Sequence, residues 1–326
     1  MKTAIFFGGS GYIGERTWKR LLGWFDRIVL SDTRNPAAKL PEGMEFVRCD
    51  VREPVIEQLA GAMDAAVPSA GSWIFHFSAV HREPGHAFQE YFDTNIPGAE
   101  HVTAFAEDVG IQNIFFTSSI AVYGETQGAT DETAPLYPSS GYGISKLAAE
   151  LIHERWAVAD PSRRLVTCRP GVVYGPGDPG NILRMIRAVK QGIFFFPGNS
   201  QIFKSYAYIE GLLDSMEFTM ARTERIIRYN YVEHPTEPLS ELVEHAERVL
   251  GKRSRTIPLP LWLLIPAAYL VQVLTRGNSA IHPKRVRKAA MSTHIVPQWL
   301  IDHGFEFKFD FEKSLKDWQL KGPRDF

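Results

Sequence analysis

The sequence has 326 residues, 44% of them hydrophobic, so the chain can bury a large core and exceeds one ordinary domain. Its 36 Lys and Arg nearly balance 37 Asp and Glu, and this net charge of −1 excludes a global field that would recruit nucleic acid. Two cysteines, no Cys/His cluster at metal-ligand spacing and no secretion signal exclude a disulfide framework and predict a metal-free cytoplasmic protein.

The first segment reads as a strand, a glycine turn and a helix. Residues 2–7 form an apolar run of strand character, glycines follow at positions 8, 11 and 14, and residues 15–22 have the pattern of a helix. Glycine lets the backbone approach a ligand closely, and a helix N-terminus presents free N–H groups and positive potential. The segment predicts a pyrophosphate site, with an ordinary tight turn as the alternative.

A second strand is predicted over residues 27–30, and Asp32 follows it. An acidic residue about 20 residues beyond such a glycine turn is placed to hold the ribose hydroxyls of a dinucleotide. Because a carboxylate there repels a 2′-phosphate, Asp32 indicates NAD as the cofactor. Arg34 lies two residues further along and keeps NADP as the lesser alternative.

Strands and helices then alternate along the chain, a pattern typical of a parallel sheet covered by helices on both faces. The predicted strands cover residues 45–50, 73–79, 113–117, 164–169 and 226–231. The predicted helices cover residues 97–109, 142–159, 182–191, 209–219 and 239–250. The sequence therefore predicts an α/β fold with a doubly wound parallel sheet of the Rossmann type.

The character of the chain changes near Gly171, where an extended loop rich in Gly and Pro follows. We predict a smaller, mostly helical C-terminal substrate domain beyond this point. The NAD-binding domain would comprise residues 1–168 and about 203–230. The substrate-binding domain would comprise about 169–202 and 231–326.

Tyr142 and Lys146 lie four residues apart in a predicted helix and so share one of its faces. A free phenol has a pKa of about 10, too high to release its proton readily near neutrality. A neighbouring Lys cation favours the phenolate, so Lys146 is predicted to lower the pKa of Tyr142. The pair is a candidate acid/base unit for an alcohol or a carbonyl, and a solvated helix face is the alternative.

Together these segments resemble the extended short-chain dehydrogenase/reductase family, which includes nucleotide-sugar epimerases, dehydratases and 3β-hydroxysteroid-dehydrogenase-like enzymes. The glycine turn, the strand-end segment His76–Ala79, the helix start Asn95–Gly98, the serine segment 117–124 and the segment Arg169–Pro176 carry the resemblance. It implies cofactor contacts from Gly8, Gly11, Tyr12, Ile13, Gly14, Asp32, Arg34, Asp50, Val51, Phe77, Ser78, Ala79, Asn95, Thr117, Tyr142, Lys146, Pro170 and Val173.

The resemblance also implies the catalytic roles. Aligning the serine segment assigns the catalytic hydroxyl to Ser119, with Ser118 as the alternative and Thr117 as a poorer candidate. Ser119 would hydrogen-bond the reacting oxygen, and Tyr142 would transfer its proton. Lys146 would hold the nicotinamide ribose and lower the pKa of Tyr142.

The substrate is harder to predict than the chemistry. The candidate contacts are His81, Ser118, Ser119, Asn181 and Lys204. Lys204 would suit an anionic diphosphate, as in sugar-nucleotide enzymes. Arginine is common at that position in the family, and asparagine is common where this chain has glycine or valine at 171 and 172.

The favoured function is an NAD-dependent epimerase or dehydrogenase acting on a secondary alcohol of a nucleotide sugar. A 4,6-dehydratase is not expected, because the Thr-Asp-Glu triplet at 130–132 lies outside the serine segment. The alternatives are a 3β-hydroxysteroid-dehydrogenase-like oxidoreductase or carbonyl reductase on a hydrophobic alcohol, and a non-catalytic dinucleotide sensor. The family also implies a homodimer through residues 97–109 and 142–159.

Residues 257–274 form the most apolar segment of the chain, too short and too rich in proline for a membrane span. Basic residues flank it at 252–255 and at 284–288. Packing against the body of the protein is the simpler interpretation. Peripheral contact with a membrane containing anionic lipid is the lesser alternative.

Overall fold

The computed structural model describes residues 1–326 except 38, 64–68, 84, 127, 179 and 276–281. The chain forms two compact units and passes between them several times. The first comprises residues 1–124, 135–170 and 213–231, and the second comprises residues 125–134, 171–212 and 232–326.

Two segments that the sequence assigned to the NAD-binding domain, 125–134 and 203–212, lie in the second unit. The reason is local pairing of their backbones. Thr130 forms a bridge with Ile295, and the strand at 206–208 pairs with residues 172–174.

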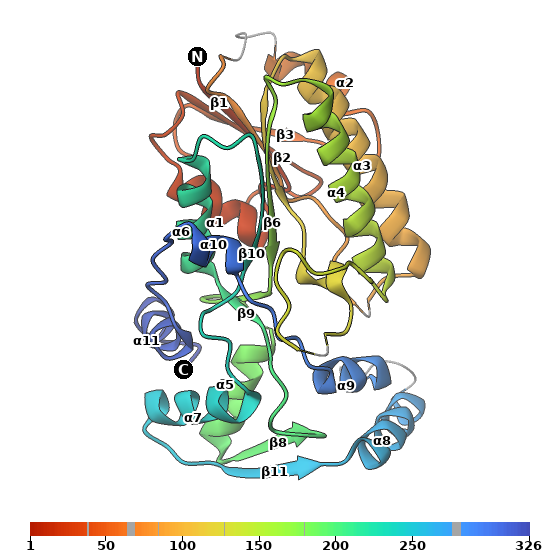
Figure 1. The fold of residues 1–326 in the computed structure, drawn as a ribbon, viewed down its shortest axis with the longest axis vertical. Helices are drawn as coiled ribbons and strands as arrows, with labels where there is room; N and C mark the ends of the chain where they lie inside the picture. The colour runs from red at the N-terminus through yellow and green to blue at the C-terminus, as the bar shows by residue number, and fades with distance from the viewer. Residues whose placement is uncertain (38, 64–68, 84, 127, 179, 276–281) are drawn as a thin grey trace. The chain divides into compact units, whose positions relative to one another are not determined.

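The centre of the first unit is a parallel sheet of seven strands in the order β10-β6-β5-β4-β1-β2-β3 (Figure 1). The strands are β1 (Thr3–Phe7), β2 (Arg27–Asp32), β3 (Met44–Arg48), β4 (Trp73–His76), β5 (Asn113–Thr117), β6 (Arg164–Pro170) and β10 (Ile226–Tyr231). Strands buried on both faces need near-continuous apolar sequence, as in the β1 segment Ala4–Phe7, which has no exposed surface. The strand order reverses between β1 and β4, and sheets of this kind bind ligands at the carboxyl ends of such strands.

Helices cover both faces of this sheet. They are α1 (Tyr12–Arg20), α2 (Val55–Met63), α3 (Phe88–Asp108), α4 (Gly141–Ala159) and α6 (Ile209–Met220), with a short 3₁₀ turn, η1 (Ile120–Tyr123). On one face, α3 packs against both α2 and α4. On the other, Arg20 of α1 forms ion pairs with Asp214 and Glu217 of α6. The doubly wound sheet predicted from the sequence is therefore present.

The start of α3 and the end of β4 differ from the boundaries predicted from the sequence. The helix expected at 97–109 begins at Phe88 and passes through Pro97. Proline usually starts a helix because it lacks an N–H, but here the buried Tyr91 and Asn95 hold the preceding turns in place. Strand β4 ends at His76, so the three residues that follow belong to a loop.

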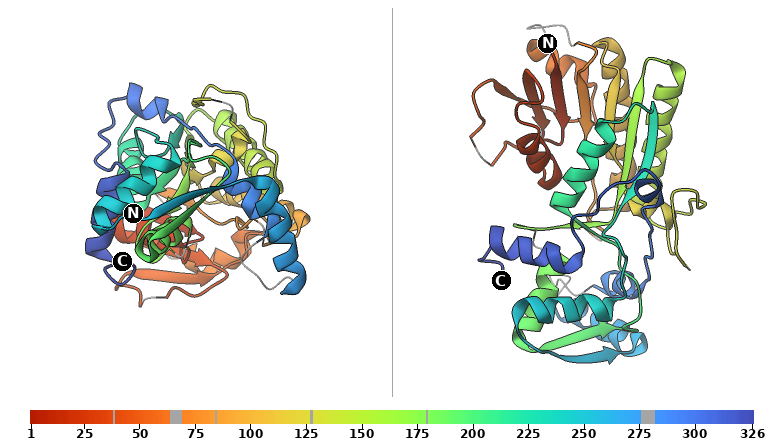
Figure 2. Two further views of the ribbon diagram at one scale, coloured as in Figure 1. Left: turned by 90° about the horizontal axis from the view of Figure 1, so that it is seen from below. Right: turned by 60° about the vertical axis from the view of Figure 1, so that its left-hand side comes forward.

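The second unit contains two short parallel strand pairs and several helices. Strand β7 (Val172–Tyr174) pairs with β9 (Tyr206–Tyr208), and β8 (Ile193–Pro197) pairs with β11 (Arg255–Leu259). The helices are α5 (Asn181–Gln191), α7 (Leu239–Leu250), α8 (Leu261–Leu274), α9 (Pro283–Ala290), α10 (Gln298–Asp302) and α11 (Phe311–Lys321). Figure 2 shows β8 and β11 side by side, and α5 packs against both β8 and α7.

The apolar segment 257–274 does not pack as expected. Its first residues complete β11, and the remainder forms α8, in which Ala268 is the only buried residue. Exposed side chains along α8 include Trp262, Val273 and Leu274, at 76%, 74% and 74% exposure. Among the described residues, no helix is long and apolar enough to cross a bilayer.

Candidate active site

The glycine turn after β1 brings backbone segments closer than any side chain would allow. A Cβ atom on Gly14 would lie 2.4 Å from the carbonyl oxygen of Gly8, and one on Gly8 would lie 2.7 Å from the amide nitrogen of Ser78. Gly8 also has φ of +83°, and Gly11 forms the N-cap of α1. The buried hydroxyl oxygen of Ser10 has no hydrogen-bond partner among the described residues. A helix N-terminus, an open backbone turn and an unpaired hydroxyl fit a pyrophosphate group.

Asp32 ends β2 beside this turn. Its carboxylate accepts hydrogen bonds from the amides of Ser10 at 3.1 Å and Arg34 at 3.0 Å, which fix it in place. The Arg34 side chain is 73% exposed, and its Nε lies 3.8 Å from Asp32 Oδ1. Tyr12 and Ile13 form the first turn of α1. The structure thus gathers the residues predicted to hold the phosphates and the adenosine ribose.

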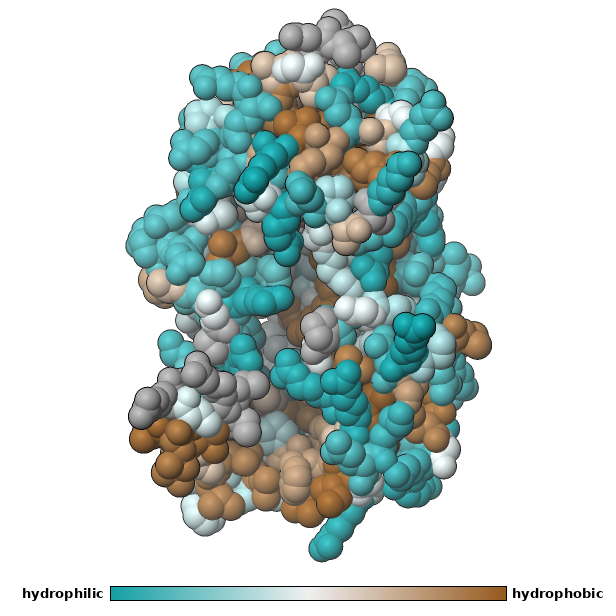
Figure 3. All heavy atoms as spheres, turned by 180° about the vertical axis from the view of Figure 1, so that it is seen from behind, coloured by the Kyte–Doolittle hydropathy of each residue, from teal (hydrophilic) through white to brown (hydrophobic). Residues whose placement is uncertain are grey.

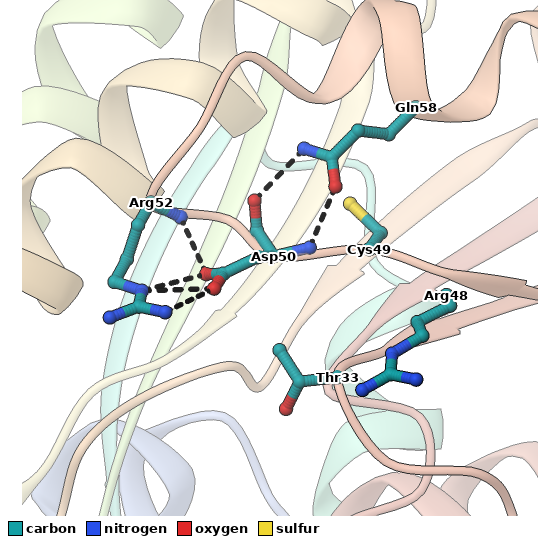
Figure 4. A pocket seen from close by; sticks show the side chains of 6 residues that line it. All are labelled: Thr33, Arg48, Cys49, Asp50, Arg52 and Gln58. Carbon is teal, nitrogen blue, oxygen red and sulfur yellow. Dashed lines mark hydrogen bonds and ion pairs between the residues drawn. The ribbon is translucent and has the colours of Figure 1, made fainter.

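A hollow lies beside the end of β3, lined by the residues shown in Figure 4. Gln58 accepts a hydrogen bond from the amide of Asp50 at 2.8 Å and donates one to its carbonyl oxygen at 3.0 Å. Arg52 binds the Asp50 carboxylate through Nε and Nη2, and this holds the pKa of Asp50 below its usual range. Asp50 and the buried Val51 were predicted to hold the adenine ring, whereas Gln58 and Arg52 were missed.

Asn95 ties the loop after β4 to the helix that carries the predicted acid/base pair. Its Oδ1 accepts from the amide of Val80 at 2.9 Å, and its Nδ2 donates to Val80 O at 3.1 Å and to Ser145 Oγ at 2.9 Å. Ser145 lies on α4 between Tyr142 and Lys146. Asn95 therefore positions the half-buried loop residues Phe77, Ser78 and Ala79.

The Ser119 side chain lies near enough to Tyr142 to oppose the rise in the pKa of that phenol. Ser119 is the N-cap of η1, and its Oγ accepts the amide of Ala121 at 3.1 Å, which leaves the hydroxyl proton for Tyr142. Ser118 is buried, and its hydroxyl has no partner within the described part of the chain. Thr117 ends β5. This geometry favours Ser119 as the hydroxyl that works with Tyr142.

The pKa of Tyr142 shifts in the direction opposite to the one expected from the sequence. Burial raises the pKa of Tyr142 to about 12, and the Ser119 side chain opposes this increase. Burial also lowers the pKa of Lys146 to about 7, while the nearby Glu150 opposes that decrease. Lys146 therefore carries only part of its charge near neutrality, which weakens its pull on the phenol.

Lys146 is 2% exposed and lies in a nearly closed aromatic environment. Its Nζ sits 4.1 Å from the centre of the Phe116 ring, and that ring stacks on His153 with centres 4.1 Å apart. His153 Nε2 lies 3.1 Å from Nδ1 of His76, and burial lowers the pKa of His153 to about 3. These neutral rings exclude water around Lys146 without adding charge.

The other predicted contacts lie on several elements. His81 is exposed, and its Nδ1 lies 3.5 Å from the carbonyl oxygen of Ala79. Pro170 ends β6 in the first unit. Val173 lies in β7 and Asn181 begins α5, both in the second unit.

Lys204, also in the second unit, is bound by backbone oxygens. Its Nζ donates hydrogen bonds to the carbonyl groups of Lys288 and Met291. Burial and the charge of Lys288 lower the pKa of Lys204 to about 8. Its ammonium group therefore fixes the end of α9, a role that the sequence pattern did not reveal.

A family model described as the NAD dependent epimerase/dehydratase family matches residues 4–229. The chain belongs to this family. It is 27% identical over 317 residues to the N-acetyl-alpha-D-glucosaminyl-diphospho-ditrans,octacis-undecaprenol 4-epimerase of Escherichia coli O157:H7, covering 95% of this chain and 92% of that relative.

Two further matches agree with this assignment. The chain is 27% identical over 228 residues to short-chain dehydrogenase/reductase family 42E member 1 of Xenopus laevis, covering 66% of this chain and 57% of that protein. The fold matches the UDP-glucuronic acid 4-epimerase of Bacillus cereus, solved with UDP-glucuronic acid and NAD, at a TM-score of 0.74 and 18% identity, covering 99% and 100% of the two chains.

Membership of the NAD dependent epimerase/dehydratase family confirms the resemblance, the fold class and the cofactor predicted from the sequence. The protein is an NAD-dependent enzyme of the extended short-chain dehydrogenase/reductase type. The glycine turn and the carboxylate of Asp32 fit that cofactor.

A buried polar network that lies beside Lys146 was not predicted from the sequence. Arg169 of β6 donates to both carboxylate oxygens of Glu150, at 2.9 and 2.6 Å. It also donates to the Tyr123 hydroxyl at 2.9 Å, and that hydroxyl donates to Asn230 Oδ1 at 2.8 Å. Two signals were available: a charged residue inside an apolar strand, and an acid four residues after Lys146 on the same helix face.

The depressed pKa of Lys146 makes stability depend on pH. The unfolded chain binds this proton up to about pH 10.4, whereas the folded protein releases it near pH 7. The free energy of unfolding should therefore rise with pH across this window, by up to about 1.4 kcal/mol per pH unit. Lys146→Met removes this contribution, so the wild type should gain stability over the variant as pH rises.

Chemical denaturation of both proteins between these pH values measures the gain. Lys19→Met, on the exposed face of α1, controls for the loss of a surface lysine. A difference between wild type and Lys146→Met that stays constant with pH would show that Lys146 keeps its proton in the folded state.

Proposed function

We propose that the enzyme is an epimerase acting on a secondary alcohol of a nucleotide sugar, with net dehydrogenation of the same alcohol as the alternative outcome. The observation that carries the proposal is the Ser119 hydroxyl close to the buried Tyr142, with Lys146 one turn further along α4. Sugar epimerases among the relatives and structural neighbours support it.

In the proposed reaction, Tyr142 first loses its own proton, which its raised pKa opposes, and then takes the proton of the sugar hydroxyl. Ser119 donates a hydrogen bond to the same oxygen, while the Ala121 amide holds its Oγ in place. NAD held by the glycine turn, Asp32 and Lys146 would supply the hydride acceptor for the carbinol carbon and, in an epimerisation, the hydride donor. Tyr142 then gives its proton back to the oxygen of the inverted sugar.

Lys146 holds the ribose hydroxyls of the cofactor in this proposal. Its buried position near Phe116 makes each hydrogen bond from the ammonium stronger than it would be in water. Glu150, one turn further on α4, favours the charged form of Lys146. Residues Gly8 to Gly14 and Asp32 bind the remainder of the dinucleotide.

A second substrate class is a hexose carried on a polyprenyl diphosphate. The relative that spans 95% of this chain is named for such a substrate. Both classes present a sugar ring joined to a diphosphate, so the same hydride-transfer site serves either. A hydrophobic alcohol of the hydroxysteroid type has weaker support, since the 42E relative matches only 66% of this chain.

We also propose a homodimer through α3 and α4. Three apolar residues on α4, Ile144, Leu151 and Val158, are exposed and recur every seventh residue, so they form one stripe. A cytoplasmic location remains a prediction, which the buried free thiols of Cys49 and Cys168 support.

The decisive experiment offers the purified protein UDP-hexoses, a polyprenyl-diphosphate hexose and hydrophobic alcohols, after NAD released by denaturation has been identified. We expect retained NAD and conversion of one diphosphate-linked sugar into its epimer without accumulation of NADH. NADH that accumulates in step with a hydrophobic alcohol, with every sugar unchanged, would refute the proposed function.

A further inference from the structure

Helix α8 presents an apolar surface to solvent. Its sequence, Leu-Trp-Leu-Leu-Ile-Pro-Ala-Ala-Tyr-Leu-Val-Gln-Val-Leu, contains no charged residue. The large side chains that are roughly half or more exposed are Trp262, Leu263, Tyr269, Leu270, Val273 and Leu274. Figure 3 shows apolar side chains gathered at the lower left of that view, over α8. Soluble proteins seldom leave so continuous an apolar surface uncovered.

Part of this surface forms a single stripe. Trp262, Tyr269, Leu270 and Val273 follow the spacing of one helix face, and all four are more than half exposed. We call these four residues the α8 face. Tryptophan and tyrosine prefer the boundary between water and the hydrocarbon of a membrane, where the ring is apolar and the N–H or O–H is wet.

Helix α9 packs against α8 and carries positive charge. It contains no acidic residue. Its basic side chains, all exposed, are Lys284, Arg285, Arg287 and Lys288. Before α8, Arg253 lies 3.5 Å from Glu247 and Lys252 donates a hydrogen bond to the carbonyl oxygen of Lys190. The α9 side chains add positive charge on the helix that packs against α8.

The length of α8 shows whether the helix could span a bilayer or only lie in its interface. Its 14 residues span about 21 Å at 1.5 Å per residue, whereas a bilayer core is about 30 Å thick. A helix of this length lies in the interface and does not cross the membrane.

A second copy of the chain is a poorer occupant of this surface. A two-fold symmetric contact would bring the α8 faces together and place the two sets of α9 cations near each other. Like charges at such a boundary oppose association. An anionic surface satisfies both the apolar helix and the basic helix.

We propose that α8 and α9 dock the protein on an anionic lipid bilayer, with the α8 face inserted among the acyl chains and the α9 cations against the headgroups. The inference is independent of the proposed function, since it rests on residues of these two helices alone. The proposal gives the apolar segment 257–274 a role in binding lipid.

Flotation of the full-length protein with vesicles tests the proposal. We expect the protein to float with vesicles of phosphatidylcholine and phosphatidylglycerol in equal parts, and far less with phosphatidylcholine alone. Added salt should weaken binding, because it screens the attraction of the α9 cations. Protein that stays at the bottom of the gradient with both vesicles would overturn the proposal.

Two variants locate the contact. Leu270→Glu should lower binding by about tenfold or more, since it places a charge in the apolar face. Lys284→Glu with Arg287→Glu should lower it by at least roughly 25-fold, at about fivefold for each cation lost. The matched controls are Leu320→Glu, at an 83% exposed leucine of α11, and Arg184→Glu with Arg187→Glu on α5, which change the net charge equally.

The controls should bind as the wild type does, and thermal unfolding should confirm that all variants are folded. Equal binding by Leu270→Glu and Leu320→Glu would refute the α8 face as the contact. Light scattering that finds a wild-type dimer and a Leu270→Glu monomer, without flotation of either, would assign α8 to contact between copies and overturn the lipid proposal.

Discussion

Replacing Tyr142 by Phe should lower kcat by about 10²- to 10⁴-fold or more, because the variant keeps the ring and loses the only proton-transferring atom proposed for the sugar oxygen. Binding of NAD should be nearly unchanged, since the phosphate and adenosine contacts lie at the glycine turn, Asp32 and Asp50. Single-turnover rates with the best sugar substrate, and NAD retention after gel filtration, measure the two effects separately.

Tyr91→Phe is the matched control for this loss of a phenol. The Tyr91 ring lies 6.3 Å from that of Tyr142, and its hydroxyl donates to the carbonyl oxygen of Arg82 at 2.6 Å. Its removal should weaken a loop contact and leave proton transfer intact. Full activity of Tyr142→Phe would refute Tyr142 as the acid/base group and would point to the non-catalytic alternative.

Breaking the buried pair between Arg169 and Glu150 should destabilise the fold by about 3–5 kcal/mol. The two side chains are 1% and 4% exposed, so Arg169→Met leaves a carboxylate buried without its partner. The doubly substituted Glu150→Gln, Arg169→Met protein should recover part of this loss, because neither member of the pair is then left as a buried charge without its partner. Urea denaturation of the wild type, Arg169→Met, Glu150→Gln and the double variant gives the coupling energy directly.

Arg228 and Glu154 provide an internal comparison for this prediction. They also join a sheet strand to α4, at 2.8 Å, but are 37% and 36% exposed. Arg228→Met should therefore cost no more than about 1 kcal/mol. Equal losses of stability from Arg169→Met and Arg228→Met would show that burial is not what makes the Arg169 pair important.

The parts of the fold that sequence predicted well are those decided by neighbouring residues. The strand, turn and helix around Gly8 and Gly14 follow from the glycine spacing, although only Gly14 avoids a clash within the turn itself, whereas Gly8 avoids one with the distant Ser78. The spacing of four residues between Tyr142 and Lys146 likewise predicts that both side chains lie on the same face of α4. Family membership confirms the NAD-binding fold to which the glycine turn pointed, whereas the roles of Tyr142 and Lys146 stay predictions.

Features that depend on residues distant in the sequence could not be predicted from local sequence patterns. Pro97 lies inside α3 because burial of Tyr91 and Asn95 outweighs the missing backbone donor. The pKa of Tyr142 rises because the fold removes water from it, which spacing along a helix does not report. The binding of Lys204 to the end of α9 links residues more than eighty positions apart.

The path of the chain between its two units affects how the protein can fold while it is being synthesised. Strand β6 ends at Pro170, and its outer neighbour β10 begins only at Ile226, after the chain has contributed residues 171–212 to the other unit. A ribosome adds roughly 5–20 residues per second, so the edge of β6 stays open for several seconds of synthesis. An open parallel edge is a template for wrong pairing. A truncated messenger that stops before Ile226 would therefore yield an aggregation-prone fragment, and neither unit corresponds to a single stretch of gene that can be expressed alone.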